Sequence, residues 1–283
     1  MSVPDPHATL LARIWRRIPV VVRATVVALV ILAIGQAPPG LALWVNLSRW
    51  PDVPLFLVVT AVWLWLYWRW LDGGGWPRGT SAQRHAHLRA TPLNGSVWRW
   101  SLLAGGAGMA AVLGLALLTG RIAALPAEAY EAPLDVSAWP PFTTFAFFLS
   151  LAATAGVVEE AAFRGYMLTQ IERRHGWIVA IVLSGALFYV VHLSHAYATP
   201  AFVPFFAAYS ALHGLLVYLT RSIRPSVVVH VAGDFCILPI QYGAVPLPFG
   251  TTALPYLVLV LVAAAIAVPA FFGLAARTRV LRE

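Results

Sequence analysis

Long apolar segments recur along the whole chain, and short polar connections separate them. We count eight such segments, at residues 20–36, 54–71, 100–119, 141–170, 177–195, 200–219, 226–240 and 253–275. A membrane-spanning helix needs about 20 apolar residues, whereas a transmembrane β-barrel shows short alternating segments, which this sequence lacks. The pattern therefore predicts an all-α polytopic membrane protein, with about eight transmembrane helices in a single membrane domain, residues 1–283.

The charged residues of the connections predict the orientation of these helices. All 19 basic residues are arginine, and 17 of them fall in the two tails or in the even-numbered connections. Only Arg49 and Arg121 fall on the other side. Because positively charged connections stay in the cytoplasm, this distribution predicts that both termini are cytoplasmic. The same rule accounts for the net charge of +8, which we therefore do not interpret as nucleic-acid binding.

Composition excludes two further classes of protein. The chain is 60% hydrophobic and only 11% charged, whereas an ordinary soluble domain has about 25% charged residues. A lone cysteine, Cys236, excludes a disulfide framework or a cysteine metal cluster within one chain.

Two adjacent glutamates, Glu159 and Glu160, follow an apolar run of more than a dozen residues. An ionisable side chain inside a membrane helix costs several kcal/mol, so such a residue indicates a functional site. In a helix Glu160 and Arg164 share a face and can pair, while Glu159 is rotated by about 100° from Glu160. One site can thus hold an ionised carboxylate beside a protonatable one.

Two later apolar segments supply partners for these carboxylates. His192 closes the sequence Phe188-Tyr-Val-Val-His192, and Asp234 follows His230 by four residues, on the same helical face. Asp234 can orient the imidazole of His230 or share a ligand with it. Imidazole and carboxylate groups are also zinc ligands, so a metal site built from these residues and Glu159 is a second interpretation.

The remaining histidines have simpler interpretations. We expect His195 and His213, on apolar segments, to be hydrogen-bonded packing residues, and His85, His87 and His175, in polar connections, to be solvated. The sequence lacks the His-Glu-x-x-His motif of zinc proteases, the Gly-x-Ser-Gly of rhomboid-like enzymes and the Gly-x-Gly-Asp of intramembrane aspartyl enzymes.

The charged motifs occur in a fixed order: Glu159-Glu160-x-x-x-Arg164, Phe188-x-x-x-His192 and His230-x-x-x-Asp234. This set resembles the CAAX-protease and bacteriocin-processing family (CPBP, or Abi), which includes the Ras-converting prenyl-protein endopeptidases. The resemblance covers residues 159–234. It implies an intramembrane endopeptidase with an eight-helix core, whose catalytic part would be residues 141–240.

The resemblance also implies a role for each motif residue. Glu159 and His192 would activate a water molecule, and His230 and Asp234 would contact the tetrahedral intermediate. Glu160 and Arg164 would shape the site, and Phe188 would contact the substrate. Members of the family have been described with and without zinc, so no cofactor is assigned. If a metal takes part, its expected ligands are Glu159, His192, His230 and Asp234.

The expected partners are the lipid bilayer and a protein or peptide substrate, and no nucleic acid. We expect a bacterial inner-membrane protein that acts in peptide maturation. Two other functions stay open at this point: a proton-coupled transporter whose membrane glutamates, histidines and aspartate form a relay, and a catalytically idle membrane scaffold.

Overall fold

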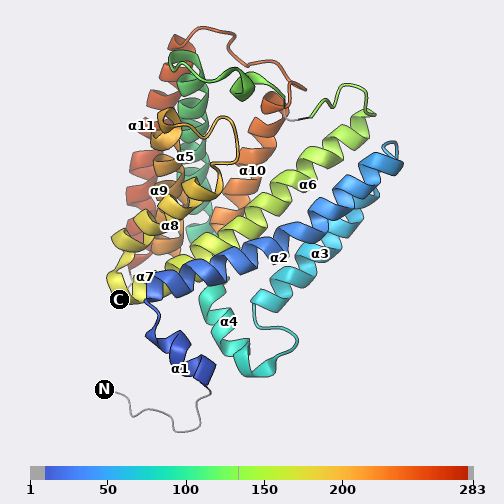
Figure 1. The fold of residues 1–283 in the computed structure, drawn as a ribbon. Coiled ribbons are helices and arrows are strands. Elements are labelled where there is room, and N and C mark those ends of the chain that lie inside the picture. The colour runs from blue at the N-terminus through green and yellow to red at the C-terminus, as the bar shows by residue number, and fades with distance from the viewer. Residues whose placement is uncertain (1–9, 133, 280–283) are drawn as a thin grey trace.

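The computed structural model describes residues 10–132 and 134–279, and within these ranges it contains helices and no strands (Figure 1). Each of the eight predicted apolar segments forms a helix. These helices are α2 (Val20–Arg49), α3 (Leu55–Leu71), α5 (Gly95–Ile122), α6 (Pro141–Glu159), α8 (Trp177–Val191), α9 (Val203–Thr220), α10 (Arg224–Gln241) and α11 (Leu254–Arg277). The predicted all-α class is confirmed.

Five helical segments of the described chain are long and apolar enough to cross a membrane. They are Val20–Arg49, Gly95–Ile122, Pro141–His175, Pro200–Thr220 and Leu254–Arg277. Helices α3 and α8 are apolar but shorter, with 17 and 15 residues. Helix α10 carries Arg224 and Asp234 and is not among the five. The chain is therefore an integral membrane protein with five candidate spans, and the count of eight stays a prediction.

The predicted end of the first helix is wrong. Residues Ala37-Pro38-Pro39-Gly40 led us to expect a stop at Gln36, yet α2 continues to Arg49. A proline lacks the N–H that would bond to the carbonyl four residues earlier, so Pro39 leaves the Gly35 carbonyl without its helical donor. The indole N–H of Trp63 on α3 donates to that oxygen at 3.1 Å. Such replacement by a neighbouring helix is what makes proline tolerable in a membrane helix.

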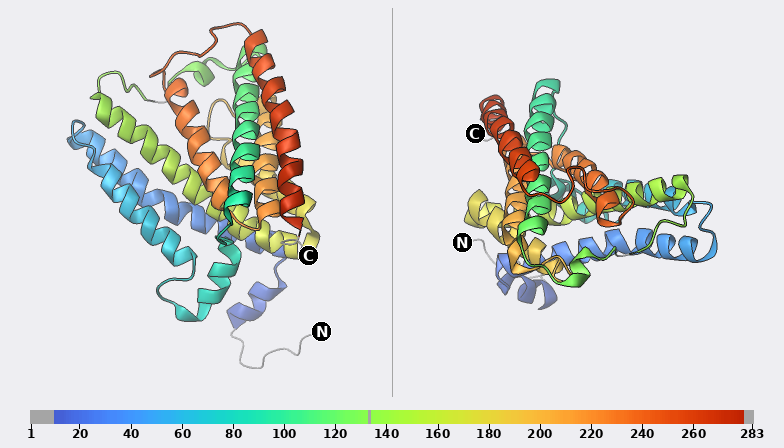
Figure 2. Two further views of the ribbon diagram at one scale, coloured as in Figure 1. Left: turned by 180° about the vertical axis from the view of Figure 1, so that it is seen from behind. Right: turned by 90° about the horizontal axis from the view of Figure 1, so that it is seen from above.

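The helices form two groups inclined to each other (Figures 1 and 2). Helices α2, α3 and α6 lie side by side in one group, and α5 packs along α11 in the other, next to α9. Helix α10 joins the groups because it packs against both α6 and α5. The main core of buried apolar side chains draws on both groups. Most of the functional side chains described below come from α6, from the segment that directly follows it, and from α8 and α10, where the two groups meet.

Shorter helices lie at one end of the bundle: α1 (Leu10–Arg17), α4 (Ser81–Leu88) and α7 (Leu168–His175), with the 3₁₀ turn η1 (Arg78–Thr80) before α4 (Figure 1). Two further 3₁₀ turns are η2 (Ala127–Tyr130) and η4 (Pro200–Phe202). We expected a solvated loop where α4 forms, and this expectation is wrong for His87. Its side chain is buried against the ring of Tyr166, because α4 folds back under the bundle.

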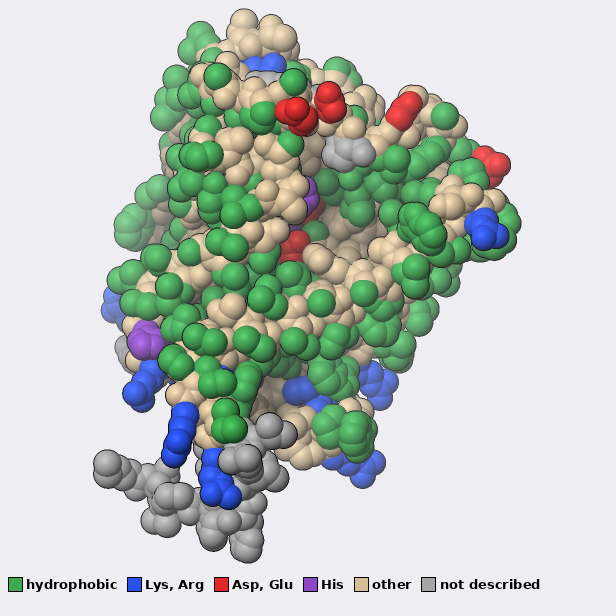
Figure 3. Space-filling model, viewed as in Figure 1, with side chains coloured by type: hydrophobic (Ala, Val, Ile, Leu, Met, Phe, Trp, Pro, Cys, Tyr) green, Lys and Arg blue, Asp and Glu red, His purple; other side chains and the backbone are tan. Residues whose placement is uncertain are grey.

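Charge is distributed unevenly between the two ends of the molecule. In Figure 3 most of the visible arginine side chains gather at the end where α1 lies, and the acidic side chains gather mainly at the opposite end. The end of α11 lies on the same side as α1 (Figure 1). Arg282, one of the arginines that entered the orientation argument, lies outside the described residues. The cytoplasmic position of the termini stays a prediction.

Candidate active site

The two glutamates lie where the helical geometry changes. Helix α6 ends at Glu159, and the chain continues as a π-helical segment, η3 (Glu160–Met167), before α7. Wider turns of this kind are frequent at functional sites. Gly156, one turn earlier, allows α10 to approach closely, because a Cβ atom there would lie 2.5 Å from Val231 Cγ2. This close approach brings His230 beside the glutamates.

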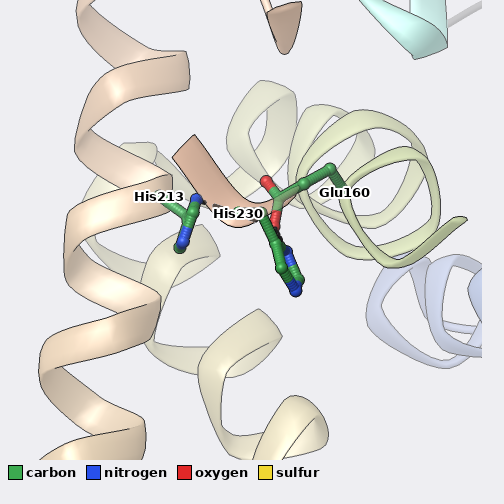
Figure 4. A group of neighbouring side chains, drawn as sticks. All are labelled: Glu160, His213 and His230. Carbon is green, nitrogen blue, oxygen red and sulfur yellow. Dashed lines mark hydrogen bonds and ion pairs between the residues drawn. The ribbon is translucent and has the colours of Figure 1, made fainter. Parts of the chain in front are cut away.

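Glu160 is the centre of a fully buried polar network (Figure 4). Its Oε1 accepts a hydrogen bond from Nδ1 of His230 at 2.9 Å, and its Oε2 accepts one from the hydroxyl of Ser226. Because the serine proton points to Glu160, Nδ1–H of His213 donates to the serine oxygen, at 2.7 Å. Both oxygens of Glu160 are thus occupied by protein donors, so this carboxylate holds other groups in position.

Arg164 balances the charge of Glu160. Its Nη1 lies 3.4 Å from Glu160 Oε1, and the side chain has almost no exposed surface. The guanidinium also lies over the ring of Phe188, 4.5 Å from the ring centroid, which is a cation–π contact. Phe188 in turn stacks on Tyr209, with 5.3 Å between centroids. The predicted pairing of Glu160 with Arg164 is confirmed, and Phe188 packs against the arginine at the edge of the cavity described next.

The other motif residues line one cavity of about 440 Å³ between the two groups of helices. Glu159 comes from the end of α6, His192 from the end of α8, and His230 and Asp234 from α10. Nε2 of His230 lies 3.9 Å from Oε2 of Glu159 and 3.4 Å from Oδ2 of Asp234. Figure 3 shows a hollow in the molecule with acidic and histidine side chains inside it. The sequence motifs therefore converge on a single chamber.

Hydrogen bonds select the nitrogen that each imidazole presents to this chamber. His192 Nδ1 donates to the backbone carbonyl of Phe188 at 2.6 Å, one turn back along α8. His230 Nδ1 is bonded to Glu160. In both rings Nδ1 is the hydrogen-bond donor to the protein. Nε2 is therefore the nitrogen that remains to bind a ligand, since the hydrogen bond made by one ring nitrogen determines the protonation of the other.

Three residues of the site were not singled out in the sequence. His213, which we expected to be a packing residue, is buried and bonded to Ser226, whose hydroxyl reaches Glu160. Ser226 precedes His230 by four residues, so the shared helical face was a signal that could have indicated it. His195, also expected to be a packing residue, is exposed and lines the cavity.

The residues present allow a test of the metal interpretation. The ligand atoms of Glu160, His213 and His230 lie within 4.8 Å of one another. However, both oxygens of Glu160 already accept hydrogen bonds, and the Arg164 cation lies beside them, which disfavours a second cation. The donors that line the cavity fit zinc better in their chemistry. They are two imidazole nitrogens and two carboxylates, and each imidazole is held by an acceptor on its other nitrogen.

The fold and the site together define a helical membrane protein with a chamber of carboxylates and imidazoles between its helices. Comparison with protein-family models matches residues 141–236 to the family described as Type II CAAX prenyl endopeptidase Rce1-like. This match confirms the resemblance to the CPBP/CAAX protease family, and the matched segment contains every motif residue from Glu159 to Asp234. The family supports an intramembrane protease activity in general terms. No curated protein and no solved structure matches the chain.

Proposed function

We propose that this protein is an intramembrane endopeptidase that hydrolyses a peptide bond with water activated by Glu159 and His192. The observation that supports this most strongly is the shared chamber: Glu159, His192, His230 and Asp234 come from three helices and line one cavity. Ionisable residues inside a membrane are costly, so a cluster of four of them in an apolar bundle indicates a function.

The attack on the substrate needs a base. Water held by the Glu159 carboxylate and Nε2 of His192 transfers a proton to one of them as its oxygen attacks the peptide carbonyl carbon. The electron pair of the carbonyl bond moves to the carbonyl oxygen. His192 suits this task because its Nδ1–H is committed to the Phe188 carbonyl, which leaves Nε2 with a free lone pair.

The oxyanion then needs a donor. Nε2 of His230, when it carries a proton, faces the chamber and can donate to the oxyanion, and a low-dielectric chamber strengthens that interaction. Glu160 fixes the ring from the opposite nitrogen, and Asp234, 3.4 Å from Nε2, orients it from the cavity side. When the intermediate collapses, the carbon–nitrogen bond breaks and the proton held by the base moves to the leaving amine. The products are a carboxylate and an amine.

The same four side chains, Glu159, His192, His230 and Asp234, would hold a zinc ion if the enzyme is metal-dependent. Zinc bound there would lower the pKa of a bound water molecule. Elemental analysis of the purified protein, beside an activity assay after chelator treatment, tests this part of the proposal.

The proposed substrate is a membrane-tethered protein or a hydrophobic peptide. Aromatic and aliphatic side chains, including Leu43, Phe205 and Phe206, form much of the cavity wall away from the charged residues. Such a wall suits an apolar segment of a substrate. We further propose a bacterial inner-membrane location with cytoplasmic termini, in keeping with the arginine distribution, and a role in peptide maturation.

Hydrolysis can be tested on protein reconstituted in lipid nanodiscs with a library of membrane-tethered reporter peptides in ¹⁸O-labelled water. Mass spectrometry should find one ¹⁸O atom in the new carboxylate of each cleaved peptide. Glu159→Gln should abolish cleavage, and Glu128→Gln, at an exposed position of η2, should leave it unchanged. Cleavage by the Glu159 variant at the wild-type rate would overturn the proposal.

A further inference from the structure

A second cavity, of about 470 Å³, lies at the end of the bundle where α1 meets α2 and where α7 ends. The described residues of its wall are four basic side chains and a short apolar stretch, with no acidic residue among them: Arg17, Ile18, Pro19, Val20, Arg23, Arg174 and His175. None of these residues belongs to the active site. The cavity is therefore a cationic site of its own.

Within the part of the chain that the structure describes, the positive charge of this cavity is not neutralised. The acidic residue nearest along the chain, Glu172, is already paired with Arg89 at 2.6 Å and with Arg221 at 2.5 Å. Among the described residues, no salt bridge joins Arg17, Arg23 or Arg174 to a carboxylate. Arg23 Nε has no hydrogen-bond partner among the described residues either. The Arg23 guanidinium thus has no counter-charge in the described structure, which leaves it to pair with an anion in the cavity.

Phosphate is the acceptor that these groups recognise best. A guanidinium offers two parallel N–H groups to a phosphate, and three arginines surround the cavity. Helix α2 begins at Val20, in the wall of the same cavity. The unpaired amide groups of a helix N-terminus add partial positive charge and favour an anion at this position.

The position of the cavity indicates where such a phosphate comes from. Helix α2 is an apolar candidate span, so its N-terminal end lies at the membrane surface. Helix α1, next to it, exposes 50% of Ile14 and 40% of Trp15, and Arg13 and Arg17 of the same helix are exposed as well. Exposed tryptophan and apolar residues on a basic helix are typical of a segment that lies in the membrane interface.

We propose that this cavity binds the phosphate of an anionic phospholipid between Arg17, Arg23 and Arg174, with α1 lying on the membrane surface beside it. Basic pockets between membrane helices on the cytoplasmic side hold acidic headgroups in this way. The proposal does not depend on the enzymatic function, since it uses none of the residues of the active site.

The test is a lipid-binding measurement on the full-length protein. Wild type and Arg23→Gln/Arg174→Gln are purified and exchanged into mixed micelles of detergent with phosphatidylglycerol or with zwitterionic phosphatidylcholine. Native mass spectrometry then counts the lipids retained. We expect wild type to retain phosphatidylglycerol in preference to phosphatidylcholine, and the double variant to bind phosphatidylglycerol about tenfold more weakly. Arg78→Gln/Arg99→Gln removes the same charge from other exposed positions of the chain and should bind like wild type.

Two results would overturn the proposal. One is equal retention of phosphatidylglycerol by wild type and the double variant. The other is displacement of the lipid by millimolar inorganic phosphate, which would assign the cavity to a free phosphate. If the double variant does not fold, the measurement moves to wild type alone. Thermal unfolding must then show saturable stabilisation by phosphatidylglycerol and none by phosphatidylcholine. If phosphatidylglycerol does not stabilise the protein in this way, the proposal is contradicted.

Discussion

Glu160 and His230 lie 70 residues apart in the sequence, yet Oε1 of the glutamate accepts a hydrogen bond from Nδ1 of the histidine at 2.9 Å. This bond links the π-helical segment after α6 to α10, across the boundary between the two groups of helices. It also turns Nε2 of His230 towards Glu159 and Asp234. One hydrogen bond therefore contributes both to the packing of the bundle and to the geometry of the cavity.

The two adjacent glutamates should respond differently to the same substitution. Glu159 faces the cavity, so Glu159→Gln should abolish cleavage and leave the unfolding temperature close to that of wild type. Glu160→Gln places an amide NH₂ against the donors of Ser226 or His230 and leaves Arg164 buried without a counter-charge. Breaking a buried ion pair in this way costs about 3–5 kcal/mol.

Thermal unfolding of the detergent-solubilised proteins, run beside the cleavage assay, separates the two effects. Equal destabilisation by both substitutions would contradict the division of roles between a cavity-facing glutamate and a positioning one.

Ser226 gives a test of the network behind the catalytic groups. Ser226→Ala removes the link between His213 and Glu160, and the loss of these buried hydrogen bonds should cost about 1–3 kcal/mol of unfolding free energy. Ser226 holds Glu160, and Glu160 positions His230. The rate of cleavage should therefore also fall, by about tenfold.

Ser210→Ala is the matched control, since Ser210 is equally buried and its hydroxyl has no hydrogen-bond partner among the described residues. We expect this variant to keep both stability and activity. A similar loss in both serine variants would show that the cost comes from packing rather than from the hydrogen bonds of Ser226.

The sequence was sufficient to predict the four motif residues that line the chamber, for a physical reason. Glu159, His192, His230 and Asp234 are costly in an apolar segment, so each one required a partner, and the nearest available partners were one another. A serine carries no comparable penalty, because a backbone carbonyl of its own helix can satisfy its hydroxyl, and His213 lies outside the three motifs that singled out the other histidines. Ser226 and His213 therefore gave only a weak signal before the helices were placed.

The two wrong predictions about the fold, the end of the first helix and the exposure of His87, have a similar origin. Two consecutive prolines normally end a helix, and only the position of Trp63 on the neighbouring helix shows how α2 passes them. The burial of His87 depends on α4 folding under the bundle, where Tyr166 from a segment about 80 residues later meets it. Both outcomes rest on contacts between distant segments, which a local pattern of apolar and polar residues does not contain.

His87 should make the stability of the protein depend on pH. Burial, together with the positive charges of Arg173 and Arg89, lowers the pKa of His87 from 6.5 to about 4. The folded protein thus binds this proton more weakly than the unfolded chain does. The stabilisation is fully present above pH 6.5 and is lost as the pH falls from 6.5 towards 4. We expect a loss of about 1–2 kcal/mol over this interval.

The measurement compares the unfolding free energy of wild type and His87→Gln between pH 7.5 and pH 4. The difference between the two proteins isolates His87 from other titrating groups. As the pH falls, wild type should lose more unfolding free energy than His87→Gln does. A constant difference across the range would mean that His87 is not held neutral by its surroundings.

Gly156 should be essential for bringing the two catalytic helices together. A methyl group at this position would lie 2.5 Å from Val231 Cγ2 and 3.0 Å from the Val231 backbone nitrogen, so Gly156→Ala must move α10 away from α6. Val231 is the neighbour of His230, and the displacement therefore separates His230 from Glu160 and Glu159. Overpacking of this kind costs about 1–3 kcal/mol, and we expect cleavage to fall by more than the loss of stability accounts for.

Gly106→Ala on α5 is the control, because a methyl group there meets no atom within 4 Å. It should keep full activity and gain slightly in stability, since alanine favours a helix over glycine. Activity and unfolding temperature measured on both variants test this, and a fully active Gly156→Ala protein would show that the approach of α10 to α6 does not set the geometry of the site.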